Sequence, residues 1–127
     1  REVLGIGREW LREAAGRNPD QRQQVVELAL RLLAEFGDSL IARKCGPGLS
    51  EQAALLAGRV LAAGWPDGVA AVSAMAELDG FLRSEGNRRN PGTTADMTAG
   101  ILFAALRDGQ FIMDPVQFGA VDSVVAG

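Results

Sequence analysis

The stretch NPDQRQQVVELALRLLAEF, residues 18–36, decides the fold class because its apolar side chains recur at steps of three and four residues. These side chains are Val25, Leu28, Ala29, Leu32, Leu33 and Phe36. Such spacing places them on one face of an α-helix. The stretch also begins like a helix, since Asn18 can cap it, Pro19 fits the first helical position and Asp20 complements the positive end of the dipole. The sequence therefore predicts a core helix here.

The residues that follow keep this periodicity up to a firm break. Leu40 and Ile41 stay in phase across Gly37, so DSLIARK (residues 38–44) is predicted to continue the helix, either straight or kinked at the glycine. CGPG, residues 45–48, then ends it. Further helices are predicted over residues 3–15 with a frayed start, after a cap at Ser50, over about 69–85 and over about 94–107.

The predicted fold class is all-α, a multi-helix bundle of about five helices with an irregular C-terminal tail. Strand-favouring runs hardly occur, and tyrosine and histidine are absent. The tail after residue 107 has apolar residues without a stable period, so at most one short helix is expected in it. A chain of 127 residues corresponds to one domain, so residues 1–127 are predicted to form a single helical domain. Because residue 1 is Arg and not Met, we expect a fragment of a longer protein.

Charge and residue types exclude several classes of function. The net charge of -3 gives no excess of bases for a nucleic-acid surface. There is no long apolar span or leader, so no membrane insertion is predicted and the cytoplasm is the expected location. Cys45 is the single cysteine, which rules out an internal disulfide. The absence of histidine excludes Cys-His and Ser-His-Asp catalysis and His-ligated metals, which leaves oxygen-ligated Mg²⁺ as the metal to consider.

The turn NPGTTAD, residues 90–96, has two interpretations. Thr93 or Thr94 can cap the following helix, and Asp96 lies where a carboxylate can reach back to the cap amide. A glycine, two hydroxyls and the free amides of a helix start also make a phosphate site. Spacing alone favours the helix cap.

Other polar residues leave the same choice open. Arg43 and Lys44 lie where cations commonly complement a helix C-terminus, and they are also candidates to meet an anion. Arg88 and Arg89 could neutralise phosphate or form ordinary surface. Asp79 lies beside an apolar helix stripe, where a carboxylate must be paired, solvated in a cleft or bound to a cation.

Two segments together resemble a known family. ELALRLLAEFGDSLIARKCG (residues 27–46) and AELDGFLRSEGNRRNPGTTADMTAGILFAAL (residues 76–106) are similar to the C-terminal half of the all-helical triphosphoribosyl-dephospho-CoA synthase family. This family transfers the triphosphoribosyl group of ATP to dephospho-CoA and releases adenine. The product is the prosthetic-group precursor of the acyl-carrier subunits of citrate lyase and malonate decarboxylase.

The resemblance implies roles for residues that the spacing alone leaves undecided. Asp38, Asp79 and Asp96 become candidates to hold Mg²⁺, and Asp79 and Asp96 to act in catalysis by stabilising positive charge at C1 of the ribose. The implied phosphate-facing residues are Arg43, Lys44, Asn90, Gly92, Thr93 and Thr94. The implied partners are ATP and a dephospho-CoA-like acceptor.

Two departures from the family pattern qualify this expectation. The residues after Asp38 read SLIARK where the main branches have a His-Arg-Gly-Gly-like stretch, so the chain resembles a divergent branch found with tetrahydromethanopterin-based one-carbon metabolism. Family members are also about twice as long, so the chain is expected to be the C-terminal part of a longer enzyme and incomplete alone. The alternative is a non-catalytic helical module that docks a partner, forms a homodimer or pairs with a missing N-terminal half.

Overall fold

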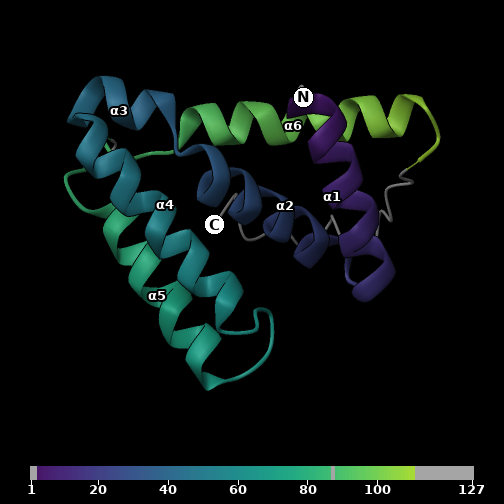
Figure 1. Cartoon of the computed structure of the whole chain (residues 1–127), viewed down its shortest axis with the longest axis horizontal. Helices are drawn as coiled ribbons and strands as arrows, with labels where there is room; N and C mark the ends of the chain where they lie inside the picture. The colour runs from purple at the N-terminus through teal and green to yellow at the C-terminus, as the bar shows by residue number, and fades with distance from the viewer. Residues whose placement is uncertain (1–2, 87, 111–127) are drawn as a thin grey trace. The chain divides into compact units, whose positions relative to one another are not determined.

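The computed structural model describes residues 3–86 and 88–110, in which every regular element is an α-helix (Figure 1). The helices are α1 (Val3–Arg17), α2 (Gln21–Phe36), α3 (Ser39–Cys45), α4 (Pro47–Ala62), α5 (Val69–Arg83) and α6 (Gly92–Arg107). The predicted all-α bundle is confirmed for this part of the chain. The predicted irregular tail lies almost wholly outside the described residues. No helix among those described combines the length and apolar character needed to cross a membrane.

Helix α2 begins later than predicted because Asp20, and not Asn18, is its cap. The Asp20 carboxylate accepts hydrogen bonds from the backbone amides of Arg22 at 2.9 Å and Gln23 at 3.3 Å. The Asn18 side chain instead accepts from the Asp20 amide at 3.0 Å and so shapes the turn before the cap. The first helical residue is Gln21, which corrects the predicted start at Pro19.

The chain breaks at Gly37, which corrects the prediction of a helix that continues through it, straight or kinked. Gly37 has φ of 65°, a left-handed conformation that no α-helix continues through. The next residue, Asp38, is extended and caps a new helix, α3. The bundle therefore has six helices in the described residues where about five were predicted.

The bounds of α1, α5 and α6 lie within two residues of prediction, whereas α4 starts four residues before its predicted start. Helix α4 begins at Pro47, so Ser50 lies in its first turn and is not its cap. Helix α5 ends at Arg83, and α6 begins at Gly92, ahead of both threonines predicted as caps.

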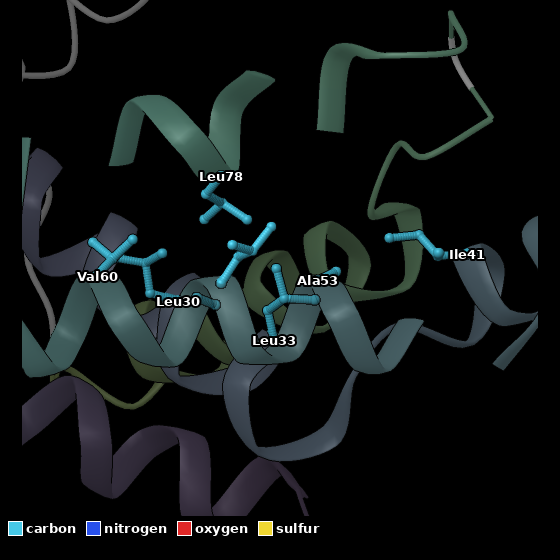
Figure 2. Packing of buried hydrophobic residues seen from close by; sticks show 8 residues of the cluster. Leu30, Leu33, Ile41, Ala53, Val60 and Leu78 are labelled. Atoms are coloured by element: carbon cyan, nitrogen blue, oxygen red, sulfur yellow. The ribbon is translucent and has the colours of Figure 1, made fainter. Parts of the chain in front are cut away.

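The chain forms two compact units, one of residues 1–28 and 97–127 and the other of residues 29–96. We call them unit 1 and unit 2. In unit 2, α4 packs against α3 and α5 (Figure 1). Its core, shown in Figure 2, consists of Leu30, Leu33, Ile41, Ala53, Leu56, Ala57, Val60 and Leu78. Burial of each large aliphatic side chain stabilises such a core by roughly 1.5–3 kcal/mol. The prediction that residues 1–127 make a single domain stays a prediction.

Unit 1 contains a close helix contact at a glycine. A Cβ atom at Gly7 of α1 would lie 2.1 Å from the Ile101 side chain of α6, so any larger residue there would force Ile101 to move. Leu11 and Ala14, on the same face of α1, are fully buried. The apolar periodicity of residues 3–15 therefore marks a packed helix, and Gly7 serves packing.

Candidate functional site

The Asp38 carboxylate is buried and accepts four hydrogen bonds. Asp38 is only 1% exposed to solvent. Oδ1 accepts from the backbone amides of Leu40 at 2.9 Å and Ile41 at 3.1 Å, which caps α3. Oδ2 accepts from the backbone amide of Thr94 at 2.7 Å and from its hydroxyl at 2.8 Å. These donors replace the water that a buried carboxylate loses.

Asp38 thereby caps α6 as well as α3. Pro91 precedes α6, and its carbonyl accepts the helical hydrogen bond from Ala95 at 3.0 Å. Proline has no side-chain oxygen, so it cannot satisfy the amides of the first turn. Thr94 is the third residue of α6, a position whose amide a cap normally binds, and Asp38 supplies the oxygen from a distant part of the chain. The anion at this helix start is therefore Asp38 itself.

Three hydroxyl groups extend this contact. Thr93 Oγ1 lies 2.8 Å from Ser39 Oγ and accepts from the Leu40 amide at 3.1 Å. Ser50 Oγ accepts from the Asp38 amide at 2.9 Å and donates to its carbonyl at 3.1 Å. We call the set Asp38, Ser39, Ser50, Thr93 and Thr94 the cap junction. It ties α3, the first turn of α4 and the start of α6 together within unit 2.

Gly92 is part of the same close approach. A Cβ atom at this position would lie 2.5 Å from Cδ2 of Leu40. Gly92 therefore lies directly against the Leu40 side chain, and its role at a phosphate stays a prediction.

A groove of about 560 Å³ lies beside the turn at residues 90–91. Its lining residues are Asp79, Leu82, Arg83, Gly86, Asn90 and Pro91. Asp79 Oδ1 accepts from Arg83 Nε at 2.9 Å, one helical turn along α5, and both side chains are exposed. This hydrogen bond and the charge of Asp79 raise the pKa of Arg83. We call this the Asp79 groove, and it presents an acid, a guanidinium group and an amide to solvent.

The structure brings some predicted site residues together and not others. Asp79 and Asn90 share the groove, and Asp38, Thr93 and Thr94 share the cap junction. The remaining predicted residues with side chains, Arg43, Lys44 and Asp96, are exposed on α3 and α6 and contribute to neither set. Asp96 makes none of the described side-chain hydrogen bonds.

The three predicted metal ligands are not gathered in one place. Among the described residues, no three acidic or cysteine side chains are grouped so that they could hold a metal ion. Both oxygens of Asp38 are already engaged by protein donors. The ligand roles of Asp38, Asp79 and Asp96 stay predictions.

Sequence reasoning missed Ser39, Ser50 and Arg83 as members of these sets. Arg83 had a readable signal, because it follows Asp79 by four residues, a spacing that pairs opposite charges on a helix. Ser39 and Ser50 had none, since their partners Thr93 and Asp38 are distant in sequence.

Comparisons with known proteins give one match. A family profile described as CitG, ATP:dephospho-CoA triphosphoribosyl transferase, matches residues 1–114. A search of curated proteins and a search of solved structures each gave no match. The matched range includes the cap junction and the Asp79 groove.

Proposed function

Since this chain belongs to the ATP:dephospho-CoA triphosphoribosyl transferase family, we propose that it acts in transferring the triphosphoribosyl group of ATP to dephospho-CoA or a related acceptor, with release of adenine. The acceptor is not restricted to dephospho-CoA, because the SLIARK segment resembles a divergent branch of the family.

One observation carries the proposal. The two segments that resemble the family, one around Asp38 and the other with Asp79 and Asn90, are separated in sequence but meet in unit 2. The turn at residues 90–94 joins them, because its first two residues line the Asp79 groove and its last two complete the cap junction. Polar side chains converge there beside a concave surface, which is the usual character of a substrate site.

The proposed reaction is a substitution at C1 of the ATP ribose. The oxygen of an acceptor hydroxyl forms a bond to C1 as the bond from C1 to N9 of adenine breaks. Adenine leaves with the bonding electrons, and the proton of the hydroxyl ends on the departing base. Positive charge develops on the ribose during this exchange, and a fixed carboxylate beside it lowers the barrier.

The groove supplies groups suited to this chemistry. Asp79 is the carboxylate that we propose to face the ribose, and Arg83, 2.9 Å from it, holds its side chain in place. The Asn90 side chain is available to hydrogen-bond a phosphate or sugar oxygen at the same groove. Asp38 is a positioning residue in this scheme, because it fixes the start of α6 through Thr94. Arg43, Lys44 and Asp96 remain proposed as outer contacts to phosphate or metal.

Magnesium fits this site only as a companion of the nucleotide. The described side chains do not form a protein cage for it. Mg²⁺ is commonly held by one or two carboxylates together with substrate phosphates, and it would supply charge neutralisation on the triphosphate. No step above depends on it.

Calorimetric titration of the 127-residue chain with a non-hydrolysable ATP analogue, with and without Mg²⁺, tests the binding part of this proposal. Adenine release from ATP in the presence of dephospho-CoA, followed by chromatography, tests the reaction. We expect Asp79→Asn to lower adenine release about 100-fold while analogue affinity changes little, because the carboxylate acts on charge that appears only in the transition state.

Asp67→Asn is the matched control, since Asp67 is an exposed aspartate of the same unit outside the groove. It should leave both measurements unchanged. A folded chain that binds no nucleotide would contradict the proposal. Adenine release that exceeds a protein-free control and is equal in the two variants would contradict the role of Asp79.

Exposed apolar side chains favour a second candidate, a docking or dimerisation module. Val69 is 87% exposed and Val72 65% exposed at the start of α5, and Leu55 on α4 is 65% exposed. Surfaces of this kind are commonly covered by a partner. Light scattering of the chain over a range of concentrations tests self-association. A docking module is not expected to bind nucleotide, so the calorimetric titration distinguishes the two candidates.

A further inference from the structure

A small basic hollow lies in unit 2 at the end of α3, apart from the residues assigned above. It has a volume of about 180 Å³. Its lining residues are Cys45, Leu49, Glu85, Arg88 and Arg89. Two arginines of the loop between α5 and α6 therefore meet the last residue of α3 and the first turn of α4.

Arg88 is fixed in this hollow by both of its ends. Its guanidinium group donates to the Lys44 carbonyl at 3.1 Å, and its own carbonyl accepts from Cys45 Sγ at 3.1 Å. The loop is thus attached twice to the end of α3. An arginine held in this way loses less side-chain entropy when it binds a ligand than a free surface arginine does.

Arg89 has a donor that the described protein does not satisfy. Its guanidinium carbon lies 4.6 Å from the centroid of the Phe81 ring, and Nη1 donates to Ser84 Oγ at 2.8 Å. Nε is buried and has no hydrogen-bond partner among the described residues. A buried donor of a permanently charged group without a partner is costly, and such groups commonly mark the position of a water or an ion.

The charges around the hollow are unbalanced. Four cations, Arg43, Lys44, Arg88 and Arg89, lie at this end of α3 or in the facing loop, and within the described residues none of them forms an ion pair. Arginines elsewhere in the same unit do pair with acids, as Arg59 does with Glu77. Glu85 is the acid that lines the hollow. This local excess of positive charge occurs in a chain whose net charge is -3.

We infer that this hollow binds a pyrophosphate-type group through Arg88 and Arg89. Two guanidinium groups present planar sets of N–H donors that match phosphate oxygens. The inference rests on the proposed function, since ATP and a dephospho-CoA-like acceptor both carry linked phosphates. The shared ligand chemistry is therefore the pyrophosphate unit, and the test must separate these two sources.

The first measurement is calorimetric titration of the 127-residue chain with inorganic pyrophosphate at low ionic strength. We expect Arg88→Gln and Arg89→Gln each to weaken binding by about tenfold or more, because each removes hydrogen bonds to a charged ligand. Arg59→Gln, an exposed arginine of the same unit outside the hollow, should leave affinity unchanged.

Glu85→Asn is a variant expected to gain affinity. It removes the acid from the hollow, and asparagine tolerates the left-handed backbone that Glu85 adopts with φ of 60°. We expect at least about a twofold increase in pyrophosphate affinity, since like charge near a bound anion is unfavourable. A gain in affinity cannot come from damage to the fold.

Cys45 gives a readout of where the ligand binds. It lines the hollow and is the single cysteine of the chain, so its alkylation by iodoacetamide reports on this place alone. Bound pyrophosphate should slow the alkylation several-fold in the native chain, and Arg88→Gln should abolish the protection. Pyrophosphate that binds without protecting Cys45, or equally well in Arg88→Gln and Arg59→Gln, would overturn the inference.

Titrations with the ATP analogue and with dephospho-CoA then identify the source and separate the two proposals. The ligand whose affinity falls in Arg88→Gln is the one whose phosphates enter the hollow. If pyrophosphate protects Cys45 but neither substrate binds, the basic site stands and the transferase proposal fails. If both substrates bind with affinities independent of Arg88 and Arg89, the transferase proposal stands and the basic site fails.

Discussion

Asp38 provides an N-terminal cap for two helices at once. Helix α6 starts after a proline, which has no side-chain acceptor, so the amides of its first turn depend on an oxygen from elsewhere. Each of the two carboxylate oxygens serves one helix start, Oδ1 for α3 and Oδ2 for α6. A single buried charge thereby orients the two segments that lead to the proposed site.

Replacement of Asp38 by alanine should therefore be strongly destabilising. We expect the free energy of unfolding to fall by about 3 kcal/mol or more, since one lost cap costs about 1 kcal/mol and each lost hydrogen bond to a charged group about 1.5–3 kcal/mol. Urea denaturation measures the change. Asp67→Ala, which removes an exposed aspartate, should change stability by about 0.5 kcal/mol or less. Equal stability of the two variants would contradict the dual cap.

Asp108 in unit 1 gives a prediction about pH. The pKa of this carboxyl is lowered below its ordinary value of 3.8, chiefly because Arg107 donates a hydrogen bond to it. The charge of Arg8, 2.9 Å away, acts in the same direction. A folded pKa below the unfolded one gives stability that is present above about pH 4 and is lost as the pH falls through the folded value. Carboxyl NMR should show Asp108 titrating below 3.8, and Arg107→Gln should raise its pKa. An unchanged pKa in that variant would remove Arg107 as the cause.

At the scale of the helices, periodicity predicted which segments are helical but could not place every end. The break at Gly37 was not predicted, because Leu40 and Ile41 keep the helical phase beyond it. The break is fixed by the Asp38 carboxylate and by Ser50, whose hydroxyl bonds both backbone groups of Asp38 from α4. Contacts between residues distant in sequence have no local signal, so a single sequence could not reveal them.

Two glycines of α1 should respond oppositely to the same substitution. Alanine is favoured over glycine within a helix by about 1 kcal/mol. A Cβ at Gly16 would meet nothing within 4 Å, so Gly16→Ala should stabilise the chain by up to that amount. A Cβ at Gly7 would lie 2.1 Å from Ile101, so Gly7→Ala should destabilise it by about 1–3 kcal/mol. Thermal or urea denaturation of both variants checks the signs, and stabilisation by Gly7→Ala would contradict the packing of α1 on Ile101.

For the molecule as a whole, the sequence identified the segments of the candidate site better than the roles of their residues. The resemblance pointed to the segments around Asp38, Asp79 and Asn90, and the structure brings these together in unit 2. The resemblance could not show that the Asp38 carboxylate oxygens cap two helices, because the second cap depends on where Thr94 lies. The roles of Arg88 and Arg89 were left undecided. A pair of loop arginines indicates a binding site only when the groups that they contact, here Cys45 and Phe81, are known.

The proposed sites belong to unit 2, so ligand protection should be uneven along the chain. At about 100 times its dissociation constant, a bound ATP analogue stabilises the states that bind it by about 2.7 kcal/mol. Backbone amides that exchange by local opening near the ligand should then exchange about 100-fold more slowly. We expect this slowing at short labelling times in α3, in the last turn of α5 and in residues 88–94, and no change in α1.

Hydrogen exchange measured by mass spectrometry on the native chain and on the double variant Asp79→Asn and Arg88→Gln checks this pattern. Asp79 lines the groove and Arg88 the basic hollow. Asp79→Asn alone should change analogue affinity little, so the weaker binding caused by Arg88→Gln should reduce protection in both regions at the same ligand concentration. The comparison also separates local protection from a general rise in stability, which would slow exchange in α1 as well. Protection of α1 equal to that of α3 would mean that the nucleotide site draws on unit 1, and a site confined to unit 2 would then be wrong.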